Sequence, residues 1–242
     1  MWNNKYSPAK LVSMEKFELI YDRALIRKGG KKALQKLLPI KTTKKKLISL
    51  PDRDYLAAMT KKIFQSGFIW RVVENKWEGF EEVFWGFEPH KLELASDEQI
   101  ERMAQEKRII RNFTKVKSVR ENAYFVKEIS EQHGGFGSFI ANWPETEITQ
   151  LWLYLKKHGC RLGGNTGPYF LRAMGKDTFL MTSDVVRYLI GQGLIDRQPN
   201  SQRDLKIVQK TFNDWQQESG NSMAELSRII ACSIGENYLS ID

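Results

Sequence analysis

Glycines and one acidic residue stand close together in the C-terminal half of the chain, in an order that could serve chemistry on a phosphate backbone. Residues 148–189 have the pattern of a helix, a glycine-rich turn, a second helix, a short extended segment and an aspartate that begins a further helix. Glycine permits positive φ and close approach of another backbone, and the first N–H groups of a helix lack partners within it. Such a turn can bind phosphate without reading base sequence.

Asp184 is the candidate catalytic group. It follows Thr182 and Ser183 at the predicted start of a helix, where the positive end of the helix dipole favours an ionised carboxylate. When a glycosidic bond breaks, positive charge develops on the sugar, and a nearby carboxylate can stabilise that charge and orient the attacking water. A Thr-Ser-Asp helix start is by itself ordinary capping, so the catalytic interpretation depends on the preceding turn.

The charge balance favours a polyanionic partner. Lysine and arginine number 38 against 29 aspartates and glutamates, which leaves a formal net charge of +9. This surplus favours capture of nucleic acid, and basic residues flank the turn. A solvated helix face is the alternative for these side chains. The predicted DNA-binding residues are Lys156, Lys157, Arg161 and Arg172 with the turn residues Gly163, Gly164, Asn165, Thr166 and Gly167.

Several other classes of protein are disfavoured. The chain has two cysteines, Cys160 and Cys232, and three histidines, without a C-x-x-C pair, so we expect no zinc site. The N-terminus lacks a signal pattern, and no apolar run reaches the length of about 18 residues that spans a membrane. We therefore expect a cytoplasmic protein without a membrane partner. Hydrophobic residues make up 41% of the chain, which is typical of a folded globular protein.

The hydrophobic pattern predicts an all-α fold. Apolar residues recur at helical spacing through most of the chain, and no long stretch alternates with a period of two. Gly29-Gly30 and Gly67 interrupt this pattern, and Ser96 with Gln99 forms a predicted capping box. The predicted helical segments are 17–38, 52–73, 97–105, 114–133, 136–142, 145–158, 168–174, 185–192, 202–219 and 222–236.

The glycine turn and the aspartate about twenty residues after it resemble the signature of the helix-hairpin-helix DNA glycosylase superfamily, an L-P-G-x-G hairpin followed by a V-D-x-H segment. Here the two parts are LGGNTG at 162–167 and SDVVR at 183–187. The resemblance implies two helical lobes with the active-site cleft between them, residues 50–178 in one lobe and residues 1–49 with 179–242 in the other. It also implies that Asp184 is the superfamily's acid.

A second stretch is similar to bacterial 3-methyladenine DNA glycosylase I. FQSGFIW, WEGFEEVFWGFEPHKL and IIRNFTKVKSVRENA are similar to that family's QAGLSW, to its aromatic helix ending in F-D-P, and to its IIR-x-x-x-K-I-x-x-x-x-x-N-A. The residues that carry the similarity are Gln65, Gly67, Trp70, Phe84, Phe87, Pro89, Ile109, Ile110, Arg111, Lys115, Asn122 and Ala123.

This similarity implies a base pocket. A glycosylase holds its extruded base between aromatic side chains, and an indole face such as that of Trp70 attracts a cationic alkylated base. Core packing is the alternative for the two phenylalanines. Lys62 stands where the family has the glutamate that contacts adenine, and the family's zinc ligands have no counterpart. The predicted pocket residues are Phe64, Gln65, Phe68 and Trp70.

We therefore predict a monofunctional glycosylase that removes a flipped alkylated purine, such as 3-methyladenine, from double-stranded DNA without a cofactor. Pro168 and Tyr169 stand where bifunctional members of the superfamily carry a nucleophilic lysine, which indicates water as the nucleophile. We further expect a bacterial, nucleoid-associated protein, and its charge favours a monomer. The alternatives are a non-catalytic protein that binds damaged DNA and a glycosylase for oxidised or deaminated bases. The lesion, a monovalent cation at the hairpin carbonyls and the role of residues 1–50 stay open.

Overall fold

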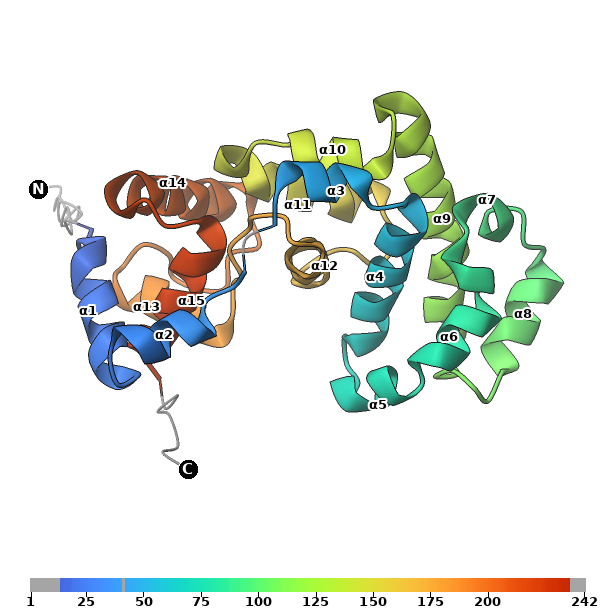
Figure 1. Cartoon of the computed structure of the whole chain (residues 1–242), viewed down its shortest axis with the longest axis horizontal. Helices are drawn as coiled ribbons and strands as arrows, with labels where there is room; N and C mark the ends of the chain where they lie inside the picture. Colours follow the sequence, from blue (N-terminus) through green and yellow to red (C-terminus); the bar gives the residue numbers. More distant parts are fainter. Residues whose placement is uncertain (1–13, 41, 236–242) are drawn as a thin grey trace, which may run out of the picture.

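The computed structural model describes residues 14–40 and 42–235, and every regular element in these ranges is a helix (Figure 1). The prediction of an all-α fold is confirmed. Several predicted segments match their helices closely, among them 136–142 and 202–219. Gly29 and Gly30 both have positive φ and separate the first two helices, and Ser96 and Gln99 form the predicted capping box.

One group of helices surrounds the long helix α9. This helix packs against α4, α7, α8 and α10, while α3 lies on α10 and α12 lies on α4. Figure 1 shows the group in the middle and at the right of the view. Its members are α3 (Lys44–Ser49), α4 (Asp52–Gln65), α5 (Trp70–Asn75), α6 (Trp77–Val83), the 3₁₀ turn η1 (Trp85–Phe87), α7 (Pro89–Leu92), α8 (Asp97–Gln105), α9 (Phe113–His133), α10 (Phe136–Asn142) and α12 (Thr166–Met174).

A second group joins the start of the described chain to its end. Helix α15 packs against α1, α13 and α14, and α2 packs against α1 (Figure 1). The side chain of Arg228 donates to the carbonyl oxygen of Leu37 at 3.1 Å, which ties α15 to the end of α2. The members of this group are α1 (Phe17–Arg27), α2 (Lys31–Leu37), α13 (Ser183–Gly191), α14 (Gln202–Ser219) and α15 (Met223–Ser233).

The two groups differ at one boundary from the lobes that the sequence suggested. The predicted lobe 50–178 begins after α3, whereas α3 packs on α10 and so belongs with the helices that follow it. Residues 1–13, 41 and 236–242 of the predicted second lobe lie outside the described residues. The division into two lobes remains a prediction about how the chain folds and moves.

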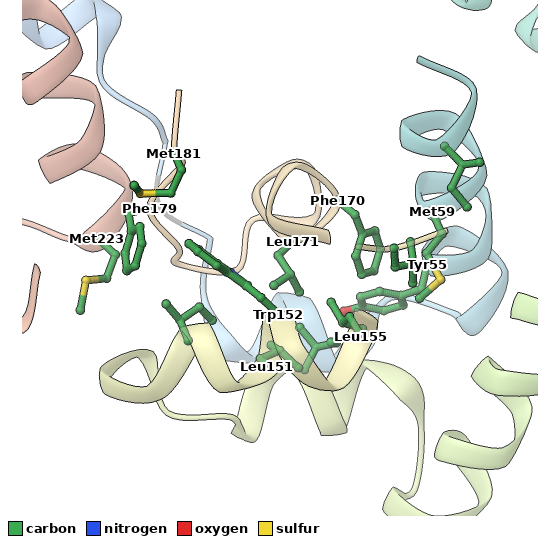
Figure 2. Packing of buried hydrophobic residues seen from close by; sticks show 14 of the residues in the cluster. Tyr55, Met59, Leu151, Trp152, Leu155, Phe170, Leu171, Phe179, Met181 and Met223 are labelled. Carbon is green, nitrogen blue, oxygen red and sulfur yellow. The ribbon is translucent and has the colours of Figure 1, made fainter. Parts of the chain in front are cut away.

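Helix α11 (Ile148–His158) joins the two groups, because it contacts both α12 and α14. Figure 2 shows Trp152 of this helix between Leu171 on one side and Phe179 on the other. The Phe179 ring stacks on Phe212 with centroids 4.0 Å apart and meets Trp152 edge-on at 4.7 Å. The Trp152 indole also donates to Thr178 Oγ1 at 3.0 Å. The hydrophobic core is therefore continuous from one group to the other.

The start of α12 differs from the prediction by two residues. The sequence suggested Pro168 as its first residue, but the helix begins at Thr166. Pro168 lies in the first turn, where a backbone N–H has no acceptor within the helix, so the missing hydrogen costs nothing.

No helix in the described part of the chain is long and apolar enough to cross a membrane.

Replacing Phe179 by alanine should lower the free energy of unfolding by about 3–5 kcal/mol, the usual cost of removing a large aromatic side chain from a core. The measurement is urea denaturation followed by circular dichroism. Phe113→Ala is the matched control, because the Phe113 side chain is 49% exposed, and its loss should stay within about 0.5 kcal/mol. Equal losses in the two variants would contradict the role of Phe179 in joining the groups.

Candidate nucleic-acid interface

The turn between α11 and α12 closes around one buried leucine. Gly159 and Gly167 flank Leu162 so closely that a Cβ on Gly159 would lie 2.5 Å from Leu162 Cδ1, and one on Gly167 would lie 2.8 Å from the Leu162 carbonyl oxygen. Gly164 has a φ of 59° and Arg161 a φ of 61°. The glycines therefore allow the tight contact that fixes the direction in which α12 begins.

The turn presents free backbone donors at the start of α12. The N–H of Thr166 donates to the Gly163 carbonyl oxygen at 3.3 Å, and the N–H of Tyr169 donates to that of Asn165 at 3.0 Å. Gly164 and Asn165 are exposed, and their N–H groups donate to no acceptor among the described residues. Donors of this kind at the positive end of a nine-residue helix suit an anion such as phosphate.

Two buried polar side chains of α9 hold the turn and the segment after α4 in place. The fully buried Asn122 amide donates to the Cys160 carbonyl oxygen at 3.0 Å and accepts from the Cys160 N–H at 2.8 Å. The Lys115 ammonium donates to the carbonyl oxygens of Ser66 at 2.6 Å and Phe64 at 3.3 Å. The sequence motif contained both residues but assigned neither a role, because such contacts join segments far apart in the chain.

A small cavity lies between the turn and the segment after α4. Its volume is about 200 Å³, below the range of roughly 300–1,000 Å³ that is common for small-molecule sites, so it suits one ring system. The Trp70 indole is half exposed, and its centroid lies 5.9 Å from that of Tyr169, which it meets edge-on. The lining residues are Lys62, Gln65, Ser66, Gly67 and Trp70 from one side and Asn165, Thr166 and Tyr169 from the other.

A chain of polar contacts runs along the α4 side of this cavity. The Lys62 ammonium donates to Gln65 Oε1 at 2.8 Å and lies 5.0 Å from the centroid of the Trp70 ring. Gln65 Nε2 donates to Glu74 Oε1 at 2.9 Å, and Lys61 pairs with the other Glu74 oxygen at 2.9 Å. Burial lowers the pKa of Lys62, and the nearby Glu74 carboxylate opposes that shift.

A second hollow of about 320 Å³ adjoins the first and shares Ser66 and Thr166 with it. Lys115, Arg161 and Gly163 also line it. Burial, and then the neighbouring Arg161 guanidinium, lower the pKa of Lys115. Two cationic side chains therefore lie beside the free N–H groups of the turn, which strengthens the case for an anion at this surface.

Two of the four predicted pocket residues line the cavity, namely Gln65 and Trp70. The prediction for Phe64 is wrong: its side chain is fully buried and meets the Phe80 ring edge-on at 4.7 Å, because it lies on the core side of α4. Phe68 is 40% exposed and lies 4.5 Å from the Lys115 ammonium, outside the cavity lining. The aromatic pattern alone could not separate core rings from pocket rings.

Among the predicted DNA-binding residues, Lys156, Lys157 and Arg161 are exposed beside the turn. The prediction for Arg172 is wrong. It lies in the last turn of α12, where its guanidinium donates to the Thr178 carbonyl oxygen and, at 3.1 Å, to Ser227 Oγ of α15. Burial lowers its pKa to about 10. Arg172 therefore joins the two helix groups and does not face a ligand at the turn.

Asp184 lies on the second helix group, in the first turn of α13. Thr182 caps this helix by accepting from the Val185 N–H at 3.3 Å. The Asp184 carboxylate is 20% exposed, lies 3.6 Å from the Arg187 guanidinium, and is so close to Gly235 that a Cβ there would be 2.9 Å from Oδ1. Asp184 lines neither hollow at the turn. The structure thus brings together the turn and the cavity, but not the acid.

A larger cavity of about 660 Å³ lies between the two groups and includes Thr182, two residues before Asp184. Its charged residues are largely satisfied within the protein. Lys176 donates to Glu145 at 2.8 Å, and the Asp177 carboxylate accepts from the N–H groups of Met223 and Ala224 at the start of α15. No three His, Cys, Asp or Glu side chains of the described residues cluster as metal ligands.

Comparison with known proteins gives one family match and several similar solved structures. The methyladenine glycosylase family model matches residues 49–159, which include α4 to α11. A variant of 3-methyladenine DNA glycosylase I from Staphylococcus aureus is 23% identical over 52% of this chain and 77% of that chain, with a TM-score of 0.46. No curated protein matches the chain.

Two further solved structures cover most of the chain. The 8-oxoguanine DNA glycosylase of Methanocaldococcus jannaschii is 15% identical over 88% of this chain and 92% of that chain, with a TM-score of 0.55. The 8-oxoguanine DNA glycosylase of Thermotoga maritima is 14% identical over 88% and 94%, with a TM-score of 0.52. The chain has the fold of helical DNA glycosylases, and the resemblance inferred from the sequence is confirmed.

Replacing Asn122 by alanine should loosen the turn between α11 and α12. The variant loses two hydrogen bonds and leaves two backbone groups of Cys160 without their partner, which should cost about 1–3 kcal/mol of unfolding free energy. Hydrogen exchange should accelerate at residues 159–165. Asn213→Ala is the control, because this partly exposed amide donates to Thr146 in another part of the molecule. Unchanged exchange at 159–165 in the Asn122 variant would refute the anchoring role.

Proposed function

We propose that this chain is a DNA glycosylase that grips double-stranded DNA at the turn between α11 and α12 and receives a damaged base in the adjoining 200 Å³ cavity. One observation carries the proposal: Asn165 and Thr166 belong to the turn and also line the cavity, opposite Trp70. The proposed phosphate-binding turn and the proposed base cavity therefore adjoin one another. The match to the methyladenine glycosylase family and the fold support the same function.

The grip on DNA uses backbone donors and cationic side chains. Phosphate oxygens accept from the exposed N–H groups of Gly164 and Asn165, while Lys156, Lys157 and Arg161 neutralise neighbouring charges. None of these groups distinguishes one base pair from another. Such contacts fix the position of the duplex without sequence preference, as an enzyme that searches all DNA for rare lesions requires.

The base enters the cavity by rotating out of the helix. Extrusion costs a few kcal/mol, least for a damaged or mispaired base, and stacking on an aromatic ring returns about 1–3 kcal/mol. Trp70 is the exposed aromatic ring on this side of the cavity, and Tyr169 meets it edge-on. An alkylated purine such as 3-methyladenine was the substrate predicted from the sequence, and it stays a prediction.

Asp184 supplies the charge for bond cleavage in this proposal. Its carboxylate lies in the first turn of α13, at the positive end of the helix, where it would stabilise a sugar that develops oxocarbenium character. A duplex bound at the turn would have to span both helix groups for the sugar to reach it. Bifunctional glycosylases carry a lysine near the start of this helix that attacks the sugar and forms a Schiff base. This chain has Pro168 and Tyr169 there, so water is the proposed nucleophile.

A second candidate is a protein that binds damaged DNA without releasing a base. The observation that favours it is the position of Asp184, which lies outside the lining of the cavity. Mass spectrometry of free base, released from duplexes that each carry one lesion, separates the two candidates. Binding without any released base would favour the non-catalytic protein.

Replacing Asp184 by asparagine should slow base release by about 10²–10³-fold, the usual effect of removing one group that stabilises transition-state charge, while DNA binding is retained. Single-turnover release and fluorescence anisotropy measure the two properties. Asp196→Asn is the control, because Asp196 is an exposed carboxylate in the loop after α13. Unchanged turnover in Asp184→Asn would remove this residue from the mechanism.

Replacing both Lys156 and Lys157 by glutamine should weaken binding to undamaged duplex and flatten its salt dependence. Each phosphate contact contributes about 0.9 to the slope of log K against log salt concentration, so two lost contacts reduce the slope by about 1.8. The matched control is the double variant Lys206→Gln with Lys210→Gln, two exposed lysines of α14. An identical slope in the two double variants would place the duplex elsewhere.

A further inference from the structure

The base cavity contains an ammonium group. Lys62 is half-buried, lines the cavity and holds its Nζ 5.0 Å from the centroid of the Trp70 ring. An ammonium near an aromatic face is attracted by the ring electrons, which are the same electrons that would attract a cationic base. The cation–π site of Trp70 is therefore already occupied from within the protein.

The neighbouring residues offer the Lys62 ammonium one hydrogen-bond acceptor, the side-chain oxygen of Gln65. The Glu74 carboxylate can only accept, so Gln65 must turn its NH₂ group toward Glu74 and its carbonyl oxygen toward Lys62. Glu74 is further occupied by Lys61 at 2.9 Å. Gln65 is the hydrogen-bond partner of Lys62 among the described residues, and an ammonium carries three N–H donors. Two of these donors remain for a ligand.

The walls that face Lys62 across the cavity carry polar groups but no carboxylate. They consist of Asn165, Thr166 and Tyr169, and the near side adds Ser66, Gly67 and Trp70. A bound cation would therefore meet one positive charge and no negative charge within the lining. A neutral ring with carbonyl oxygens on its edge would instead accept from the ammonium, which is a charge-assisted and correspondingly strong hydrogen bond.

We propose that Lys62 makes the cavity selective for an uncharged purine whose edge carries carbonyl oxygens, as deaminated and oxidised purines do, over a cationic alkylated purine. This inference rests on the proposed function, because it assumes that the cavity receives the base. It identifies the class of lesion at that site. Lys62 acts as a specificity-determining residue that donates to the base, and it takes no part in breaking the glycosidic bond.

The experiment compares four duplexes that differ in one nucleotide. Hypoxanthine and 8-oxoguanine are neutral and carry carbonyl oxygens, 7-methylguanine is cationic with a carbonyl oxygen, and 3-methyladenine is cationic without one. Single-turnover release from each duplex is measured for the wild-type chain and for Lys62→Met, Lys62→Glu and Lys62→Arg. Spontaneous loss of the alkylated bases is subtracted using duplex alone.

After this subtraction, we expect the wild type to release at least one of the neutral bases at least about tenfold faster than either cationic base. The ratio of these two rates is the quantity compared between variants. Loss of a charge-assisted hydrogen bond should reduce that ratio about tenfold in Lys62→Met. Lys62→Glu should reduce it further, since it places a negative charge beside the ligand, whereas Lys62→Arg should retain it. Lys210→Met is the control: it removes an exposed ammonium of α14 that pairs with Asp214 and lies outside the cavity lining, and it should leave the ratio unchanged.

Binding provides a second readout that does not require turnover. A 2′-fluorine on the sugar of the lesion destabilises the oxocarbenium and prevents cleavage, so anisotropy can compare hypoxanthine with 7-methylguanine in stable duplexes. Undamaged duplex and circular dichroism establish that each variant is folded and still binds DNA.

The outcomes separate this inference from the proposed function. Absence of release from every duplex contradicts the proposed function, and a preference for hypoxanthine in binding that Lys62→Met abolishes would then still support the role of Lys62. Release that favours the cationic bases would overturn the inference while leaving the glycosylase intact. A neutral-base preference that is the same in Lys62→Met and in the wild type would also overturn it.

Discussion

The turn between α11 and α12 depends on one buried amide. Asn122 of α9 both donates to and accepts from the backbone of Cys160, so it fixes the turn in two directions at once. Seven residues earlier on the same helix, Lys115 holds the segment after α4 through two carbonyl oxygens. One helix therefore sets the distance between this turn and the opposite wall of the cavity. Because both contacts are buried, each is costly to leave unmade, and the separation of the two walls is correspondingly well defined.

The link between the two helix groups has a different physical character. Trp152, Phe179 and Phe212 form a continuous aromatic cluster, and Arg172 adds polar contacts from α12 to Thr178 and to Ser227 of α15. Dispersion and burial hold this region together over many weak contacts. Helix α12 begins at the turn and ends at the Arg172 contacts. This one short helix therefore connects the candidate DNA surface with the group that carries Asp184.

The sequence predicted the fold well where local rules decide the outcome. Helical spacing, the Gly29-Gly30 break and the Ser96 capping box all depend on residues within one or two turns of each other. Through a resemblance of linear motifs it also singled out Gln65 and Trp70, which both line the 200 Å³ cavity. It was wrong for Phe64 because core and pocket aromatic rings share the same helical spacing, and for Arg172 because a basic residue's contacts within the protein leave no local pattern. The anchoring contacts of Asn122 and Lys115 bring together segments 38 to 51 residues apart, which no local pattern encodes.

Recognition of the backbone and recognition of the base are separate tasks in this arrangement. In the proposed function, backbone N–H groups and surface cations bind the phosphate backbone, and their geometry comes from glycine and from the anchors on α9. The proposed base site is lined instead by side chains of α4 and α5, where the ammonium of Lys62 contacts Gln65 and the Trp70 ring. A change at this one position can therefore alter the charge of the cavity without disturbing the turn. In the function proposed here, the lesion class depends on the charge of the cavity, whereas the grip on DNA does not.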